Sequence, residues 1–214
     1  MINDVQLGNM FYTDVKTPEI RQGDIFEGLV SIGIIPSKFL TPNILNKEHN
    51  PCFSVNLGFG YAVVVTPCCD IQKRDYLAFC PLIPLQEKVR RNEFFNEDPT
   101  RLNAKVKPEN MVPKAAWDGF SEREKAERMN NGKRYAFVNN FVFERDGDLL
   151  PIDMVIDFNF IFNISRKTLG GKNELLSPNR VLQLSSESRR ALRLKLSDYY
   201  FRDPDVCAVR PTRL

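Results

Sequence analysis

Residues 61–85 constrain the fold of this chain more strongly than any other segment. Two short apolar runs, YAVVV and YLAFCPL, flank a polar turn at residues 70–75. Three consecutive valines disfavour a helix, and an apolar run without polar interruption is typical of a strand that is buried on both faces. We therefore predict two antiparallel strands, at 61–66 and 76–82, joined by the turn.

Several other segments also have strand character. Residues 20–35 predict a strand that bends near one of its glycines, and 52–57 and 181–184 predict two shorter strands. Residues 135–144 and 148–164 flank Asp146-Gly147, a dipeptide typical of a β-hairpin turn. Apolar residues alternate along the second arm, which predicts a long strand with one buried face.

Residues 86–134 differ from the segments on either side. They are charged, rich in Asn and interrupted by prolines, which predicts an insertion. Within it, Ser121 and Glu124 have the spacing of a capping box, so a helix should run to about residue 130 and end before Gly132. A second helix is expected at 185–202. The sequence thus predicts a mainly β fold (β-rich α+β), with residues 1–214 forming a single elaborated domain.

Composition places the chain among globular proteins. Its 214 residues are 43% hydrophobic and 27% charged, and no apolar run reaches the roughly 18 residues that span a bilayer. The first residues lack the pattern of a secretory signal. The chain has 5 cysteines, an odd number that indicates free thiols rather than a disulfide framework. We therefore expect a cytoplasmic protein that makes no membrane contact.

Three motifs resemble the MazF/PemK-like toxins. Residues 21–25, RQGDI, resemble the RGDI-type opening of that family, and residues 61–67 and 77–82 are similar to its next two conserved strands. The resemblance covers about residues 20–85. It implies an SH3-like or related small barrel, RNA cleavage, and a place in a bacterial toxin-like or defence-type system.

The chain departs from that family at the positions that carry catalysis. Gly60 and Tyr61 stand where the family has an arginine–proline pair, and Leu82 and Ile83 follow Pro81 where it has a Ser or Thr. RNA cleavage needs an acid, a base and a cation near the developing charge. We therefore favour a non-enzymatic module that binds nucleic acid or a protein partner, and keep a divergent MazF/PemK-like endoribonuclease as the alternative.

Two groups of residues are candidates for these functions. The turn after residue 65 could assemble a replacement catalytic site, from Thr66, Asp70, Lys73 and Arg74. The last third of the chain is basic, with 11 Lys and Arg against 5 Asp and Glu between residues 166 and 214. Cations on a shaped surface suffice to bind a phosphate backbone, RNA or DNA. The candidates for that role are Arg166, Lys167, Arg189, Arg190 and Arg193.

A zinc-stabilised structural protein is a weaker alternative. Four soft ligands could meet if the strands pair as predicted, namely His49, Cys52, Cys69 and Cys80. Their spacing matches no zinc finger, and buried cysteines also serve as small apolar side chains. Asp153 and Asp157 share one face of the predicted strand and could bind a divalent cation, or simply face solvent. The chain has no nucleotide or dinucleotide motif, so we expect no cofactor. The sequence leaves the oligomeric state open.

Overall fold

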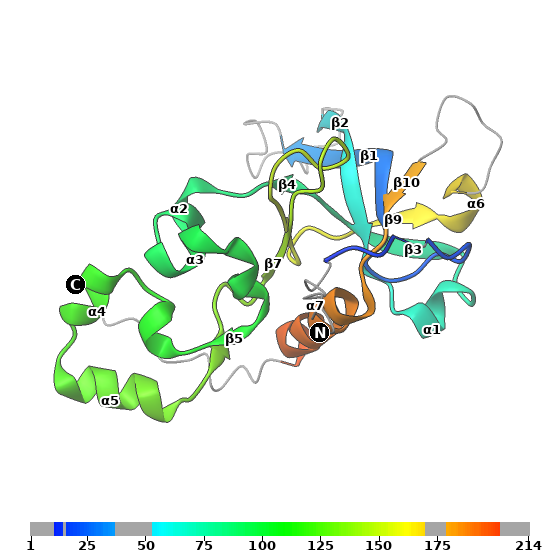
Figure 1. Ribbon diagram of the computed structural model, residues 1–214. Coiled ribbons are helices and arrows are strands. Elements are labelled where there is room, and N and C mark those ends of the chain that lie inside the picture. Colours follow the sequence, from blue (N-terminus) through cyan, green and yellow to red (C-terminus); the bar gives the residue numbers. More distant parts are fainter. Residues whose placement is uncertain (1–10, 15, 37–52, 170–178, 202–214) are drawn as a thin grey trace, which may run out of the picture.

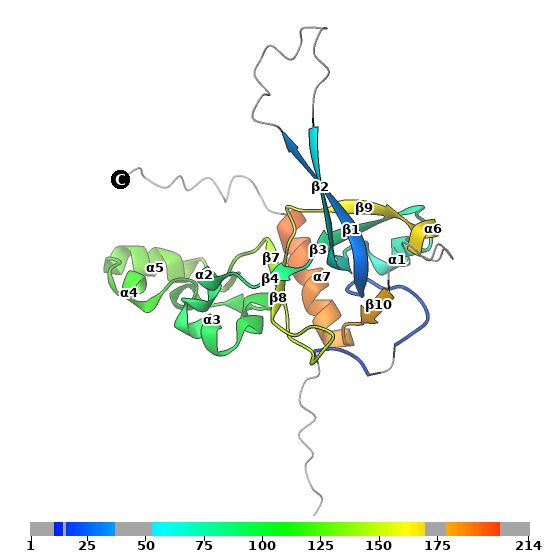
Figure 2. The same ribbon diagram turned by 90° about the horizontal axis from the view of Figure 1, so that it is seen from above.

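The computed structural model describes residues 11–14, 16–36, 53–169 and 179–201. In this part of the chain a five-stranded antiparallel sheet lies beside helix α7, and a group of short helices extends to one end of the molecule (Figure 1). Seen from above, those helices and the α1 and α6 helices lie at opposite ends (Figure 2).

The larger sheet has the strand order β10–β1–β2–β3–β9. Its strands are β1 (Ile25–Pro36), β2 (Phe53–Val64), β3 (Tyr76–Pro81), β9 (Phe162–Ser165) and β10 (Asn179–Leu182). The predicted pairing of the two apolar runs is confirmed, because Val63 lies opposite Cys80 and Val64 lies opposite Phe79. Both valines are fully buried, as the apolar run predicted.

Glycines shape the first strand. The register of β1 against β2 shifts between Phe26 and Leu29, where Gly28 has a φ of 77° and forms the expected bend. Gly23 has a φ of 91°, a conformation that glycine adopts without steric cost. An added Cβ at Gly23 would lie 2.6 Å from Leu184 Cδ1, so the close approach of the two segments also requires glycine.

Two strand predictions were wrong in their boundaries. Residues 52–57 and 61–66 were expected as separate strands, but β2 runs without interruption from Phe53 to Val64. Residues 148–164 were expected as one strand, but they divide between β8 (Met154–Asp157) and β9, which belong to different sheets. The chain turns between them because Asp157 Oδ1 accepts a hydrogen bond from Asn159 N at 2.9 Å.

The smaller sheet has the order β4–β8–β7, with β4 at Ile83–Pro84 and β7 at Asn140–Phe143. The predicted hairpin is present, but its strands are shorter and its connection is longer than Asp146-Gly147 alone. Phe143 lies opposite Met154, so the connection spans the residues between them. Within it, Asp146 and Leu150 form an isolated bridge.

The predicted insertion consists of short helices and one small two-stranded sheet. Its elements are α2 (Glu87–Arg90), α3 (Glu93–Glu97), η2 (Pro99–Asn103), β5 (Lys105–Val106), η3 (Pro108–Asn110), α4 (Lys114–Asp118), α5 (Glu122–Asn130) and β6 (Arg134–Tyr135). The capping box of α5 is confirmed: Ser121 N donates to Glu124 Oε2 at 2.8 Å, and Glu124 N donates to Ser121 Oγ at 3.3 Å. Gly132, with a φ of 69°, follows the end of the helix as expected.

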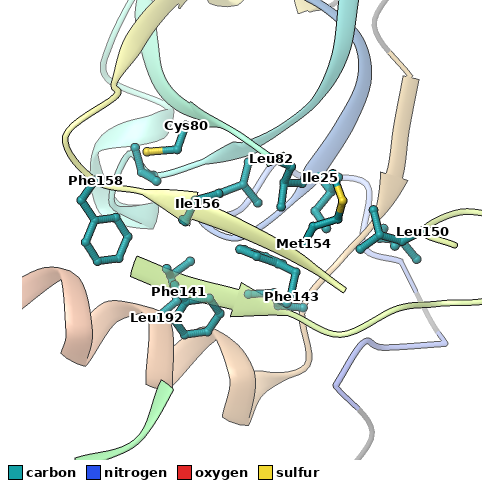
Figure 3. Close-up of a cluster of buried hydrophobic side chains, with 14 of the residues drawn as sticks. Ile25, Cys80, Leu82, Phe141, Phe143, Leu150, Met154, Ile156, Phe158 and Leu192 are labelled. Atoms are coloured by element: carbon teal, nitrogen blue, oxygen red, sulfur yellow. The ribbon is translucent and has the colours of Figure 1, made fainter. Parts of the chain in front are cut away.

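Helix α7 (Ser186–Tyr200) confirms the prediction of a C-terminal helix, with Ser185 as its N-cap. It packs over a core to which both sheets contribute, and Figure 3 shows Leu192 of α7 facing Phe141 of β7 within that core. A second cluster lies on the other face of the large sheet, around Phe26, Leu77 and Phe79. The remaining short helix, α6 (Arg166–Leu169), follows β9 directly.

The prediction of a mainly β fold is thus confirmed only in its coarse form. The described residues combine antiparallel sheets with a substantial helical content and a C-terminal helix, and their sheets do not close into a barrel. None of the described helices is long and apolar enough to cross a membrane.

Candidate functional site

A cavity of about 880 Å³ lies where the end of α7 passes the large sheet. Ligand sites in proteins usually have volumes of roughly 300–1,000 Å³. The cavity is lined by Gln22, Val65, Thr66, Pro67, Asp70, Arg74, Tyr76, Ala78, Ile161, Asn163, Arg193, Leu196, Ser197, Tyr200 and Phe201. It therefore brings together the turn after β2, which was the predicted catalytic segment, and the predicted basic helix.

Strand register explains how these residues meet. Alternate residues of β3 face opposite sides of the sheet, so Leu77 enters the core while Tyr76 and Ala78 face the cavity. Ala78 lies opposite Asn163 in the ladder between β3 and β9, which places Asn163 on the same wall. Helix α7 supplies the facing wall, because Arg193, Ser197 and Tyr200 recur at intervals of one helical turn.

Thr66, which lines this cavity, forms a side-chain hydrogen bond with the backbone of β3. Its side chain is buried, and its Oγ1 accepts a hydrogen bond from Ala78 N at 2.7 Å. Val65 N donates to Ala78 O at 2.9 Å, so the Thr66 hydroxyl completes the ladder where β2 ends. This hydrogen bond gives the Thr66 hydroxyl a structural role in the free protein.

Asp70 and Arg74 form an ion pair across one turn of the chain. Arg74 Nη2 lies 3.1 Å from Asp70 Oδ2, and the side chains are 63% and 33% exposed, respectively. The carboxylate is therefore already occupied by a cation, while much of the guanidinium faces solvent beside the cavity. Lys73 is exposed and does not line the cavity. The helix α1 (Cys68–Ile71) supplies Asp70 to this pair.

The five basic candidates occupy different environments. Arg193 is exposed and lines the cavity. Arg189 lies one helical turn before it and is half-buried, whereas Arg190 is exposed on another side of α7. Lys167 is exposed on α6.

Arg166 instead fixes the turn that carries Asp70. Its Nη1 donates to Gln72 O at 2.8 Å and to Ile71 O at 3.3 Å, and its backbone N donates to Asp75 O at 2.7 Å. Several of its donors are thus committed to backbone carbonyls near the end of α1. Arg166 therefore positions the turn beside the cavity, which the basic composition alone did not indicate.

Aromatic side chains at the cavity are unusually exposed for their size. Tyr76 is 62% exposed, Tyr200 is 61% exposed and Phe201 is 85% exposed. Partial burial, together with the neighbouring Cys80 and Tyr199, raises the pKa of Tyr200 above its ordinary value. Tyr199, its neighbour, packs instead, with its ring centroid 5.4 Å from that of Phe158. The sequence analysis did not single out Tyr76, which is the outward-facing first residue of a strand whose second residue is apolar.

Gln22 lines the cavity with a buried side chain. Its side chain is only 4% exposed, and its Nε2 donates to Val65 O at 2.8 Å. Its Oε1 is buried and accepts no hydrogen bond from the described part of the chain. The sequence named Gln22 only as part of the RQGDI motif and gave no sign that it lines a cavity.

The metal candidates do not form a site in the described part of the chain. His49 and Cys52 lie outside the described residues. Cys69 is exposed on α1, whereas Cys80 is fully buried in the core. Among the described residues no three His, Cys, Asp or Glu side chains lie close enough to hold a metal ion.

The acidic candidates also have protein partners. Asp153 Oδ1 accepts a hydrogen bond from Arg145 N at 3.1 Å. Asp157 Oδ1 accepts from Asn139 Nδ2 at 3.0 Å, in addition to its contact with Asn159. Both carboxylates therefore stabilise turns at the ends of the β7–β8 hairpin.

A second cavity, of about 750 Å³, has the opposite electrostatic character. Its charged lining consists of four carboxylates and one lysine, namely Asp98, Glu144, Glu187, Asp198 and Lys105. Lys105 Nζ lies 3.3 Å from Asp198 Oδ2, and Arg101 Nε lies 3.8 Å from Asp98 Oδ2, so the carboxylates of the lining still outnumber its one lysine. Burial and the neighbouring Asp98 and Asp153 raise the pKa of Glu144. This cavity would repel a phosphate backbone.

Comparison of the chain with protein-family models, curated proteins and solved structures finds no match.

Proposed function

We propose that the protein is a non-enzymatic module that binds single-stranded nucleic acid at the cavity between α1, β3, β9 and the end of α7. The observation that supports this most directly is the shared lining of Arg74, Arg193 and the exposed rings of Tyr76 and Tyr200. Proteins that bind single strands combine cations that follow the phosphates with aromatic rings on which bases stack.

The same residues favour binding over catalysis. Arg74 already pairs with Asp70, which makes that carboxylate a weaker base, and the Thr66 hydroxyl uses one of its lone pairs to accept a hydrogen bond from Ala78 N. An arginine that is ion-paired yet largely exposed can still contact a phosphate through its free N–H groups. The acidic cavity on the other side of α7 would favour binding at the basic one.

A divergent MazF/PemK-like endoribonuclease is the second candidate. One observation favours it: Thr66, Asp70 and Arg74, three of the four catalytic candidates, line the same cavity. The segments that resemble that family are the turn that leads into β1 and most of the residues of the end of β2 and of β3, and these three strands are neighbours in the sheet. This second proposal includes a relation of the sheet to an SH3-like barrel. It also includes a place in a bacterial toxin-like or defence-type system. A protein partner in place of nucleic acid is a further alternative.

The first experiment is a binding titration with labelled single-stranded RNA and DNA, and with the matched duplex, at several salt concentrations. We expect the single strands to bind more tightly, with an affinity that falls as salt rises. The same samples are then denatured and run on a gel. Cleavage would support the endoribonuclease, and binding of neither strand would contradict nucleic-acid binding and leave the protein partner.

Two substitutions test the location of the site. Arg193→Ala should weaken binding and reduce the dependence of log affinity on log salt by about 0.7. Arg123→Ala is the matched control, because Arg123 is 88% exposed on α5, at the other end of the molecule from α1 (Figure 1). Equal effects of the two substitutions would show that the affinity depends on overall charge and not on this cavity.

Tyr76→Ala tests stacking separately from charge. Loss of a stacked base costs about 1–3 kcal/mol of binding free energy, and the salt dependence should stay unchanged. Tyr135→Ala offers a comparison, since that half-buried ring lines the acidic cavity instead. Unchanged affinity of the Tyr76 variant would remove stacking at β3 from the proposal.

A further inference from the structure

Asp70 places a carboxylate in a cavity whose other charged lining residues are cations. Those cations are Arg74 and Arg193, and no second carboxylate of the described residues lines the cavity. The side chain of Asp70 is 33% exposed, so a ligand in the cavity can reach it. A carboxylate repels a phosphate group, and therefore an uncharged part of a nucleotide, the base or the ribose, must lie beside Asp70.

The carboxylate is held in place by its surroundings. Arg74 donates to Asp70 Oδ2 from Nη2 at 3.1 Å and from Nε at 3.4 Å. Arg166 fixes the backbone of the same turn by donating to Gln72 O at 2.8 Å. Asp70 Oδ1 has only a long contact, with Cys69 Sγ at 3.8 Å, and a thiol is a weak donor. The carboxylate is thus positioned and still able to accept a hydrogen bond from a ligand.

This chemistry determines what Asp70 can recognise. A carboxylate has acceptor atoms and no N–H or O–H of its own, so it binds hydrogen-bond donors only. Guanine presents two donors side by side on its Watson–Crick edge, the N1–H group and the amino group at position 2. Adenine and cytosine have an acceptor nitrogen beside their amino group, and uracil has a carbonyl on each side of its N–H. A carboxylate therefore meets adjacent donors only on guanine.

We propose that Asp70 is a specificity-determining residue, whose carboxylate accepts hydrogen bonds from the N1–H and amino groups of a guanine base that enters the cavity. This inference rests on the proposed function, because the rings of Tyr76 and Tyr200 and the two arginines would hold the strand there. The site should therefore prefer single strands that contain guanine. The ribose 2′-hydroxyl is the other uncharged donor of a nucleotide, and the test distinguishes it from the base.

The test compares short oligouridines that differ at one central nucleotide, by fluorescence anisotropy at one salt concentration. The first strand carries guanosine there, and the second carries inosine, which lacks only the amino group, so charge and stacking are nearly matched. One hydrogen bond to a charged group predicts about tenfold tighter binding of the guanosine strand. A third strand carries adenosine, which has an acceptor in place of N1–H, and should bind no more tightly than the inosine strand.

A fourth strand carries 2′-deoxyguanosine at the central position. It should bind about as tightly as the guanosine strand, because the base keeps both donors. Weaker binding of this strand, together with equal binding of the guanosine and inosine strands, would assign the carboxylate to the ribose hydroxyl. That result would overturn the inference.

Asp70→Asn tests the carboxylate itself, because it keeps the shape of the side chain but replaces one acceptor oxygen by an amide donor. We expect this variant to bind the guanosine and inosine strands equally. Asp118→Asn is the matched control: Asp118 is exposed on α4, at the other end of the molecule from α1 (Figure 1), so the ratio of the two affinities should not change. A ratio that persists in the Asp70→Asn variant would limit Asp70 to forming the turn and overturn the inference.

The wild-type comparison decides the matter even if Asp70→Asn does not fold. Equal, salt-dependent binding of all four strands would overturn the role of Asp70 and leave the proposed function in place. Absence of binding by every strand would overturn the proposed function itself, and the inference with it.

Discussion

Lys195, on α7, donates a hydrogen bond from its Nζ to the backbone carbonyl of Leu102, in the insertion. The lysine is fully buried, and its other acceptor is Ala136 O at 3.5 Å. No carboxylate among the described residues pairs with it; Asp198, nearby on the same helix, pairs with Lys105 instead. This side chain ties the C-terminal helix to the insertion through the Leu102 carbonyl, and its Nζ also lies 5.4 Å from the centroid of the Tyr135 ring.

Burial lowers the pKa of Lys195 well below its ordinary value. Between that lowered pKa and about 10.4 the unfolded chain binds a proton that the folded chain does not. The contribution of Lys195 to the free energy of unfolding therefore rises with pH in this window, by at most about 1.4 kcal/mol per pH unit. Lys195→Met, which keeps the apolar stem, should remove that rise.

The measurement is urea unfolding of the wild type and the Lys195→Met variant at half-unit steps from pH 7 to 9.5. The difference between the two proteins isolates the lysine, because other titrating groups contribute equally to both. Lys105→Met is the control for the loss of an exposed ammonium group, since Lys105 is 52% exposed. A constant difference for Lys195→Met would contradict a lowered pKa.

Asp24 and Arg180 form the best-buried ion pair among the described residues. Their Oδ2 and Nη1 atoms are 3.1 Å apart, and the side chains are 0% and 18% exposed, respectively. Gln183 Nε2 also donates to Asp24 Oδ1, at 2.9 Å. Burial raises the pKa of Asp24, and the hydrogen bonds and Arg180 oppose that rise. The pair fixes the RQGD loop against β10.

Arg180→Met should destabilise the protein by about 3–5 kcal/mol, because it leaves a buried carboxylate without its cation. Adding Asp24→Asn to that variant removes the unpaired charge and should restore part of the loss. Denaturant unfolding of the two single variants and the double variant measures the coupling. Strictly additive effects would show that the two side chains do not stabilise each other.

Local sequence patterns predicted the elements that depend on neighbours in the chain. The capping box at Ser121 and Glu124, the N-terminus of α7 and the pairing of the two apolar runs all follow from short-range chemistry. The division of residues 148–164 into β8 and β9 does not follow from short-range chemistry. Alternation is the same on both sides of Asp157, and the turn there is held by hydrogen bonds to the side chain and to the backbone carbonyl of Asp157, which the alternation does not encode.

The candidate site was predictable in parts and not as a whole. Thr66, Asp70 and Arg74 were named from one turn, and Arg193 was named from the basic composition. Their shared cavity depends on packing of α7 against β3, which no local pattern encodes. Gln22 was missed for the same reason, since its unmet acceptor is a property of the fold and not of the RQGDI motif.

Cysteine reactivity should follow burial. Desolvation raises the pKa of Cys80 to about 12, whereas Cys68 and Cys69 are exposed. The thiolate is the reactive form, so iodoacetamide at pH 8 should modify Cys68 and Cys69 while Cys80 stays unmodified until the protein unfolds. Mass spectrometry of peptides, taken at intervals in native buffer and in urea, gives the rates. Equal labelling of Cys80 in native buffer would contradict its place in the core.

Thr66 allows a structural role to be separated from a catalytic one. Thr66→Val keeps the shape of the side chain but leaves the amide of Ala78 without an acceptor, so we expect a loss of about 1–3 kcal/mol in the free energy of unfolding. Thr66→Ser keeps the hydroxyl and should lose much less. Unfolding in urea measures both effects, and a binding titration at a temperature where both variants are folded measures affinity.

We expect both Thr66 variants to bind single strands as tightly as the wild type, because the hydroxyl contacts Ala78 rather than a ligand. If cleavage is detected in the wild type, the same pair tests the endoribonuclease. A catalytic hydroxyl predicts that the Val variant loses cleavage and the Ser variant keeps it at equal fractions of folded protein. A structural hydroxyl predicts that cleavage follows the folded fraction in both, since the turn holding Asp70 and Arg74 is intact whenever the ladder between β2 and β3 is formed.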